Sequence, residues 1–158
     1  MTKKRVYLAG PFFSPEQKER LDLVADLLSK NPTINADAIH LPGNVQYPDA
    51  DFGTFEWQTA TFQNDIRQID QADIVVAVLD YQLEENNDEA DSGTVWECGY
   101  AHANRKPVIL VRQNKGIPLN LMLAGSYTAM FDGLEDIQNL ATYDFKILQN
   151  KYVDLSIF

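Results

Sequence analysis

The sequence predicts an α/β fold, a doubly wound five-stranded parallel sheet with helices on both faces. Short, apolar, β-prone runs alternate along the chain with longer segments whose apolar residues recur at helical spacing, as in a parallel sheet joined by helices. Two of the apolar runs, at residues 73–79 and 107–111, are almost unbroken, which is typical of strands buried on both faces. Five strands favour the flavodoxin-like order 2-1-3-4-5.

Capping and turn residues mark the element boundaries. The first strand is predicted at residues 6–9. Ser14 can cap the helix that follows, Pro15 suits its first position, and Gln17 completes a capping box. The remaining strands are expected at residues 38–41, 73–79, 107–111 and 127–131, and the remaining helices at 57–71, 93–104, 117–122 and 134–140.

Length and charge narrow the classes of protein. We expect a single domain over residues 1–158, because the length suits one hydrophobic core and no repeat or linker interrupts it. The formal net charge of −10 argues against a nucleic-acid or anionic-membrane partner, since both attract basic surfaces. It permits an uncharged small molecule as ligand.

The numbers of cysteines and histidines limit which metal sites, disulfides and cellular compartments are expected. Cys98 is the single cysteine, which excludes an intrachain disulfide and fits a reducing compartment. Together with His40 and His102 it makes no recognisable zinc set. No apolar stretch approaches the ~18 residues needed to span a bilayer, so we expect a soluble cytoplasmic protein.

Candidate catalytic groups gather at one end of the predicted sheet. In the order 2-1-3-4-5, ligands bind where the loops after the first and third strands diverge, here residues 10–13 and 80–91. Glu97 follows the second loop, near a helix start. Spacing alone favours a surface position for Glu97, but carboxylates without a metal set fit glycosyl transfer. A helix start and a tyrosine hydroxyl would both favour the ionised form that a nucleophile needs.

Four short motifs occur together and in order, which makes them specific although each is weak alone. They are Tyr7-Leu8-Ala9-Gly10-Pro11-Phe12-Phe13, Asn64-Asp65 with Ala72-Asp73, Asp91-Ser92-Gly93-Thr94 with Glu97-Cys98-Gly99-Tyr100-Ala101, and Pro118-Leu119-Asn120-Leu121-Met122. On these motifs the chain resembles the nucleoside 2-deoxyribosyltransferase family, from the first strand to about Met122. The resemblance implies transfer of 2-deoxyribose between purine or pyrimidine bases, through a covalent deoxyribosyl-glutamate and with net retention at C1′.

The resemblance also implies roles for individual residues. Glu97 would be the nucleophile and Tyr7 the residue that orients it. Asp73 and Asp91 would recognise the base and deliver its proton. The implied substrate-binding residues are Phe13 in the pocket wall, Gln46 near the base, and Asn120 and Met122, which relatives lend to a neighbouring subunit's site.

The resemblance further bears on cofactors and partners. It implies no metal or organic cofactor, and it implies deoxynucleosides and free nucleobases as partners. The family forms homo-oligomers, commonly hexamers with shared active sites, which would cover the apolar tail from residue 141 to Phe158. The loop at residues 41–55 and the bulky Trp96 differ from the pattern of the family. These differences leave open whether the chain accepts purines only or both purines and pyrimidines, and Gln46 favours the broader specificity.

Two other functions stay open from the sequence. One is a deoxynucleoside 5′-monophosphate N-glycosidase, in which residues 91–94 would cradle a phosphate at a helix start, although the acidic loop before them lacks Arg and Lys. The other is a non-catalytic nucleoside-binding module, since the same fold also carries binding domains.

Overall fold

A computed structural model describes residues 2–44 and 46–158 of the chain. Its centre is a five-stranded parallel sheet in the order β2-β1-β3-β4-β5, which confirms the predicted fold class and strand order. The strands are β1 (Lys4–Ala9), β2 (Ile34–His40), β3 (Ile74–Val78), β4 (Val108–Arg112) and β5 (Ala129–Asp132). β3 and β4 are buried along their whole length, as their unbroken apolar runs predicted.

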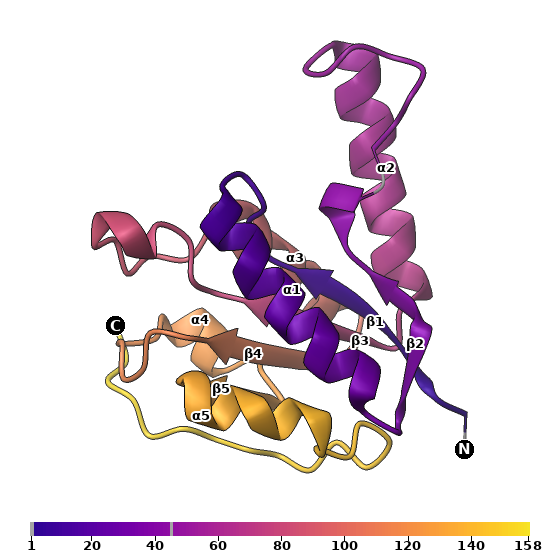
Figure 1. The fold of residues 1–158 in the computed structure, drawn as a ribbon. Helices are drawn as coiled ribbons and strands as arrows, with labels where there is room; N and C mark the ends of the chain where they lie inside the picture. The colour runs from indigo at the N-terminus through magenta and orange to yellow at the C-terminus, as the bar shows by residue number, and fades with distance from the viewer. Residues whose placement is uncertain (1, 45) are drawn as a thin grey trace.

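Helices cover both faces of this sheet, so the molecule has three layers (Figure 1). The α-helices are α1 (Pro15–Lys30), α2 (Phe55–Gln71), α3 (Ser92–Ala103), α4 (Leu121–Ala124) and α5 (Leu134–Ile137). Short 3₁₀ turns are η1 (Pro42–Asn44), η2 (Leu83–Glu85) and η3 (Gln138–Ala141). α1 and α5 lie on one face, and α2, α3 and α4 on the other; α2 extends well beyond the edge of the sheet (Figure 1).

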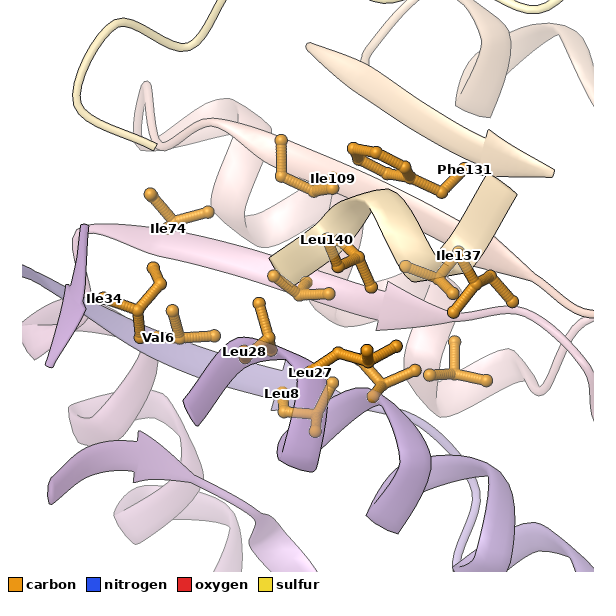
Figure 2. Packing of buried hydrophobic residues seen from close by; sticks show 14 of the residues in the cluster. Val6, Leu8, Leu27, Leu28, Ile34, Ile74, Ile109, Phe131, Ile137 and Leu140 are labelled. Atoms are coloured by element: carbon orange, nitrogen blue, oxygen red, sulfur yellow. The ribbon is translucent and has the colours of Figure 1, made fainter. Parts of the chain in front are cut away.

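The sheet divides the hydrophobic core into two clusters. On the α1 face, alternate strand residues such as Val6, Leu8 and Ile74 pack against Leu28 of α1 and Leu140 of η3 (Figure 2). The other side chains of the same strands point to the opposite face, where they form a second cluster with residues of α2, α3 and α4. Because successive strand residues point to opposite faces, each strand serves both clusters.

Capping residues begin the helices where the sequence predicted them. Ser14 accepts a hydrogen bond from the Gln17 amide at 3.2 Å, and the Gln17 side chain accepts one from the Ser14 amide at 3.1 Å, so the capping box of α1 is formed. Asp91 caps α3 by accepting hydrogen bonds from the amide and the hydroxyl of Thr94, each at 2.9 Å. α3 therefore starts at a fixed point, which sets the position of every side chain along it.

β2 is longer than predicted and α4 is shorter. The second strand is predicted at residues 38–41, but β2 already starts at Ile34, which is fully buried and pairs with Lys4. The polar residues at 35 and 37 interrupt the apolar pattern that predicts a strand. An edge strand tolerates polar residues because only one of its sides is paired. α4 starts after Asn120, which caps it by accepting the Met122 amide at 2.9 Å, whereas residues 117–122 were expected to be helical.

The C-terminal tail lies along the segment before α4. The Leu119 amide donates to Ser156 O and the Leu121 amide to Phe158 O, both at 2.9 Å, and Phe158 donates back to Leu119 O at 3.2 Å. A single parallel bridge joins Leu119 and Ile157. The tail is thus tied down by backbone hydrogen bonds, as its apolar composition led us to expect. In the part of the chain described, no helix has the length and apolar character to cross a membrane.

Candidate active site

A tyrosine from the sheet and a glutamate from a helix meet beneath the α2 and α3 layer. Tyr7 lies within β1, between β2 and β3, and its side chain is fully buried on the α2 and α3 face. Its hydroxyl donates a hydrogen bond to Glu97 Oε1 at 2.6 Å. Glu97 lies in the second turn of α3, six residues after the Asp91 cap, so the cap fixes how far the carboxylate reaches over the sheet.

The carboxyl group of Glu97 opens into a cavity of about 280 Å³ between α2 and α3. Two side chains are polar, Asp65 and Glu97, and the remaining lining is apolar or glycine. Phe62 and Trp96 are both half-exposed and meet edge-to-face at the boundary of the two helices, with ring centroids 5.7 Å apart. The complete lining is Phe62, Asp65, Ile66, Ile69, Gly93, Trp96 and Glu97. A mostly apolar cavity with a few convergent polar groups is the usual form of a small-molecule site.

Burial controls the ionisation of this carboxyl group. It raises the pKa of Glu97 from 4.5 to about 7, and the hydrogen bond from Tyr7 opposes this rise. The nearby carboxylates of Asp65 and Asp91 raise the same pKa further. The tyrosine therefore acts in the direction expected from the sequence, but removal of water from the carboxylate outweighs it. The pKa of the Tyr7 hydroxyl is raised far above its ordinary value by burial and by Glu97, so it stays a hydrogen-bond donor.

Asp65 is a member of the site to which the sequence analysis assigned no role. It lines the cavity from α2, and burial raises its pKa from 3.8 to about 6. Its Oδ1 atom is buried and has no hydrogen-bond partner among the residues described. A buried, unpaired carboxyl oxygen in a cavity is costly unless a ligand meets it. The available signal was the Asn64-Asp65 motif, which contributed to the family resemblance without a role of its own.

The other two predicted aspartates lie in different positions. Asp91 caps α3 through its Oδ2 atom and lies close enough to raise the pKa of Glu97. Asp73 precedes β3, at its amino end, where its Oδ2 accepts a hydrogen bond from the Arg5 amide at 2.8 Å. It does not line the cavity of Glu97, because the amino ends of parallel strands lie away from the edge where the crevice loops emerge. The role of Asp73 in proton delivery remains a prediction.

Phe13 and Gln46 come together, but in a different cavity. Both line a space of about 400 Å³ on the α1 side, next to Phe12 and the η1 turn. Phe13 is two-thirds exposed and packs against the Phe12 ring, with centroids 5.0 Å apart. Neither residue lines the cavity of Glu97, and their contact with the base remains a prediction.

Asn120 caps α4 and Met122 lies in its first turn, and neither residue lines the Glu97 cavity. Both are exposed, Met122 by 77%. The segment that leads to them is held from below by the buried Arg112, whose guanidinium donates to the carbonyls of Ile117 and Pro118 and pairs with Asp132. Asn120 and Met122 are therefore presented on a fixed support and remain accessible to a neighbouring molecule.

A metal centre has no counterpart in the described part of the chain. Among residues 2–44 and 46–158, no three His, Cys, Asp or Glu side chains lie together in a way that could hold an ion. The polar groups at the cavity are those of Tyr7, Asp65 and Glu97, which suit general acid, base or nucleophilic steps.

Comparison with known proteins gives one consistent family. Residues 6–122 match the family model described as nucleoside 2-deoxyribosyltransferase. The chain is 32% identical over 153 residues to a nucleoside deoxyribosyltransferase of Limosilactobacillus fermentum, which covers 89% of this chain and 86% of the relative. A second nucleoside deoxyribosyltransferase, from Lactobacillus leichmannii, is 31% identical over 134 residues, covering 79% and 82%. The solved structure of a 2-deoxyribosyltransferase from Bacillus psychrosaccharolyticus superposes with a TM-score of 0.78 at 32% identity, covering 94% of this chain and 99% of that one.

Proposed function

Because the chain belongs to the nucleoside 2-deoxyribosyltransferase family, we propose that it transfers 2-deoxyribose from one nucleobase to another through an ester on Glu97. The observation that carries this proposal is the 2.6 Å hydrogen bond from Tyr7 to Glu97 inside a cavity. A nucleophilic carboxylate must be held in one orientation and shielded from water. The hydrogen bond from Tyr7 supports the first condition at Glu97, and the partial burial of its side chain supports the second.

The reaction proceeds in two displacements at C1′. An oxygen of the ionised Glu97 attacks C1′ of a 2′-deoxynucleoside, the C1′–N bond breaks with its electrons going to the base, and the departing base takes up a proton. A nitrogen of a second base then attacks C1′ of the ester, the Glu97 carboxylate leaves, and the new base loses a proton. Each displacement inverts C1′, so the overall configuration is retained.

Asp65 is well placed to supply the proton to the departing base. Glu97 and Asp65 have pKa values raised to about 7 and about 6, so between these two pH values the pair holds close to one proton. The Tyr7 hydroxyl favours the ionised form of Glu97, whereas Oδ1 of Asp65 has no donor among the described residues. The higher pKa of Glu97 leaves the shared proton mainly on Glu97 in the resting protein, and we propose that the reactive state is the alternative form, with the negative charge on Glu97 and the proton on Asp65.

The lining of the cavity suits an uncharged substrate. Among its described residues the cavity has two carboxyl groups and no Lys or Arg. A phosphate at this place would face the negative charges of Glu97 and Asp65 without a balancing cation. This favours a nucleoside over a nucleoside 5′-monophosphate.

Transfer of the sugar is measured by incubating thymidine or deoxyinosine with free adenine and detecting deoxyadenosine by chromatography. We expect transfer by the natural chain and a loss of roughly 10³-fold or more in Glu97→Ala, since no other group replaces the nucleophile. Glu85→Gln is the matched control, because Glu85 is an exposed acid outside the cavity. An active Glu97→Ala protein, or no transfer with any pair of bases, would refute the proposal.

The role of Asp65 is tested with two kinds of leaving group. Asp65→Asn is expected to lower kcat for natural nucleosides by about 10²-fold, the usual contribution of a general acid. A 2-deoxyriboside with a nitrophenolate leaving group needs no proton, so the same variant should turn it over at close to the wild-type rate. Asp70→Asn on the same helix is the control, because Asp70 lies outside the cavity and accepts a hydrogen bond from the Tyr100 hydroxyl. Equal losses on both substrates would show that Asp65 is not the acid.

A further inference from the structure

His40 ends β2 directly beside Tyr7 in the sheet. The two residues are paired in the parallel register of β1 and β2, so their side chains leave the same face. Their rings are stacked, with centroids 5.4 Å apart and planes 23° from parallel. Val75 is the register partner of Tyr7 on the other side, in β3. The tyrosine ring is therefore flanked along its row by an imidazole on one side and by an aliphatic side chain on the other.

The stacking of His40 on Tyr7 affects the geometry of the hydrogen bond from the Tyr7 hydroxyl to Glu97. The Tyr7 hydroxyl lies at the far end of its ring, so a small tilt of the ring displaces the oxygen more than any other atom of the side chain. A hydrogen bond weakens as its angle departs from linear, and this one is only 2.6 Å long. β2 is the edge strand, so on that side of Tyr7 His40 is the last residue in the row.

The imidazole acts here through its shape and not through charge. Its Nε2 atom is buried and has no hydrogen-bond partner among the residues described, and burial lowers the pKa of His40. It is therefore neutral at neutral pH. The charged groups that line the cavity beside it are Arg5 and Asp37, and neither shares the Glu97 cavity.

We propose that His40 is a positioning residue, whose imidazole plane holds the Tyr7 ring so that the hydroxyl stays on Glu97. The proposal rests on the proposed function only for its effect on the reaction rate. The alignment of Tyr7 and Glu97 is a property of the folded protein and can be measured without substrate.

The first experiment is a double-mutant cycle on the ionisation of Glu97, followed by carbon-13 NMR of the glutamate carboxyl groups during a pH titration. Tyr7→Phe is expected to raise the pKa of Glu97, because the tyrosine hydrogen bond lowers it. His40→Leu fills the space without an aromatic plane, and it should shift the pKa in the same direction. The double variant should match Tyr7→Phe alone, since no hydroxyl remains to be positioned.

Two further variants distinguish an effect of ring stacking at His40 from an effect of its charge and from a general effect of removing a histidine. His40→Phe keeps an aromatic plane without a titratable group, so Glu97 should titrate as in the natural chain. His102→Ala removes an exposed histidine of α3 and should change nothing. Additive shifts in the double variant, or a His40→Phe protein that behaves like His40→Leu, would overturn the proposal.

The rate of transfer gives the second readout. His40→Leu should lower kcat by about tenfold with KM changed less than twofold, because an aromatic pair contributes up to about that factor. His40→Phe should recover most of the loss. If the natural chain has no transferase activity, the proposed function is wrong. The double-mutant cycle on the pKa of Glu97 would then still test the positioning role of His40. A shifted KM at constant kcat would refute the positioning role.

Discussion

At the scale of single residues, the site depends on a conflict between burial and charge. Glu97 needs a buried place to be shielded from water, and the same burial raises its pKa to about 7. The Tyr7 hydroxyl reduces this penalty without removing it. A carboxyl group in this state is reactive because it is destabilised as an anion, and the rest of the fold must offset that cost.

The destabilisation predicts a pH-dependent gain in stability for Glu97→Gln. The folded pKa of Glu97 lies above the unfolded value of 4.5, so the folded state binds the proton more tightly and stability falls as pH rises from about 4.5 to about 7. Glutamine resembles the protonated form at every pH. We expect Glu97→Gln to melt about 5 °C above the natural chain at pH 8, with the difference disappearing towards pH 4.5.

Thermal unfolding at both pH values checks this expectation. Glu85→Gln is the control, because Glu85 is exposed and lies outside the cavity. A gain in melting temperature that is the same at pH 8 and pH 4.5 would mean that ionisation of Glu97 is not its source.

At the scale of elements, α3 carries Glu97, the proposed nucleophile, and Asp91 fixes where α3 begins. Both capping hydrogen bonds, from the amide and hydroxyl of Thr94, go to Oδ2 of Asp91. The predicted contact of Asp91 with the base would use the other carboxyl oxygen. Asp91 would then have two separable functions, the observed cap, which needs any good acceptor, and the predicted chemical role, which needs a carboxyl group.

Two substitutions separate these functions. Asp91→Ala should lower stability by about 1 kcal/mol, since it removes the cap. Asp91→Asn retains an acceptor and should keep the melting temperature, while kcat/KM for transfer falls more than about tenfold if the carboxyl group serves the base. Chemical denaturation and transfer assays on the same samples give both values. Full activity in Asp91→Asn would restrict Asp91 to its role as a cap.

The sequence predicted these elements well where local signals were strong. The Ser14 capping box and the unbroken apolar runs located α1, β3 and β4, and the family motifs pointed to Glu97 and Tyr7. Asp65 received no role because its approach to Glu97 depends on how α2 docks against α3, which leaves no local pattern. The raised pKa of Glu97 was not foreseen for a similar reason, since it arises from burial by elements distant in sequence.

At the scale of the whole molecule, the predicted site is divided. Glu97, Tyr7 and Asp65 lie together between the sheet and the α2–α3 layer. Asn120 and Met122 are exposed at the start of α4 and line no part of the Glu97 cavity. Large apolar side chains are exposed on α2 and the loop before it, on α3, α4 and the tail, among them Phe52, Phe55, Phe62, Trp96, Leu121, Met122, Tyr152 and Phe158. Such exposure is typical of surfaces that contact another chain.

If sites are shared between chains, as the sequence resemblance implies, variants with substitutions in different parts of the site should complement each other. Asn120→Ala is expected to weaken sugar binding and Glu97→Ala to abolish transfer. After subunit exchange, a mixed assembly contains some sites with both natural residues, so up to about a quarter of wild-type activity should return in an equal mixture of dimers. The transfer assay measures this, with mass spectrometry to verify exchange. No recovery after verified exchange would indicate sites contained within one chain.

The position of Tyr7 inside the sheet has a consequence for how the protein loses activity. Its strand is hydrogen-bonded on both sides, to β2 and to β3, so its backbone opens only when the sheet itself comes apart. Glu97 and Asp65 are carried by outer-layer helices, and local opening of such helices requires less free energy than breaking the sheet. The hydrogen-bond donor Tyr7 thus lies in a more stable part of the molecule than its acceptor Glu97. Heating would separate the pair by releasing the helices first, while the strand that holds the donor still exchanges its amide protons slowly.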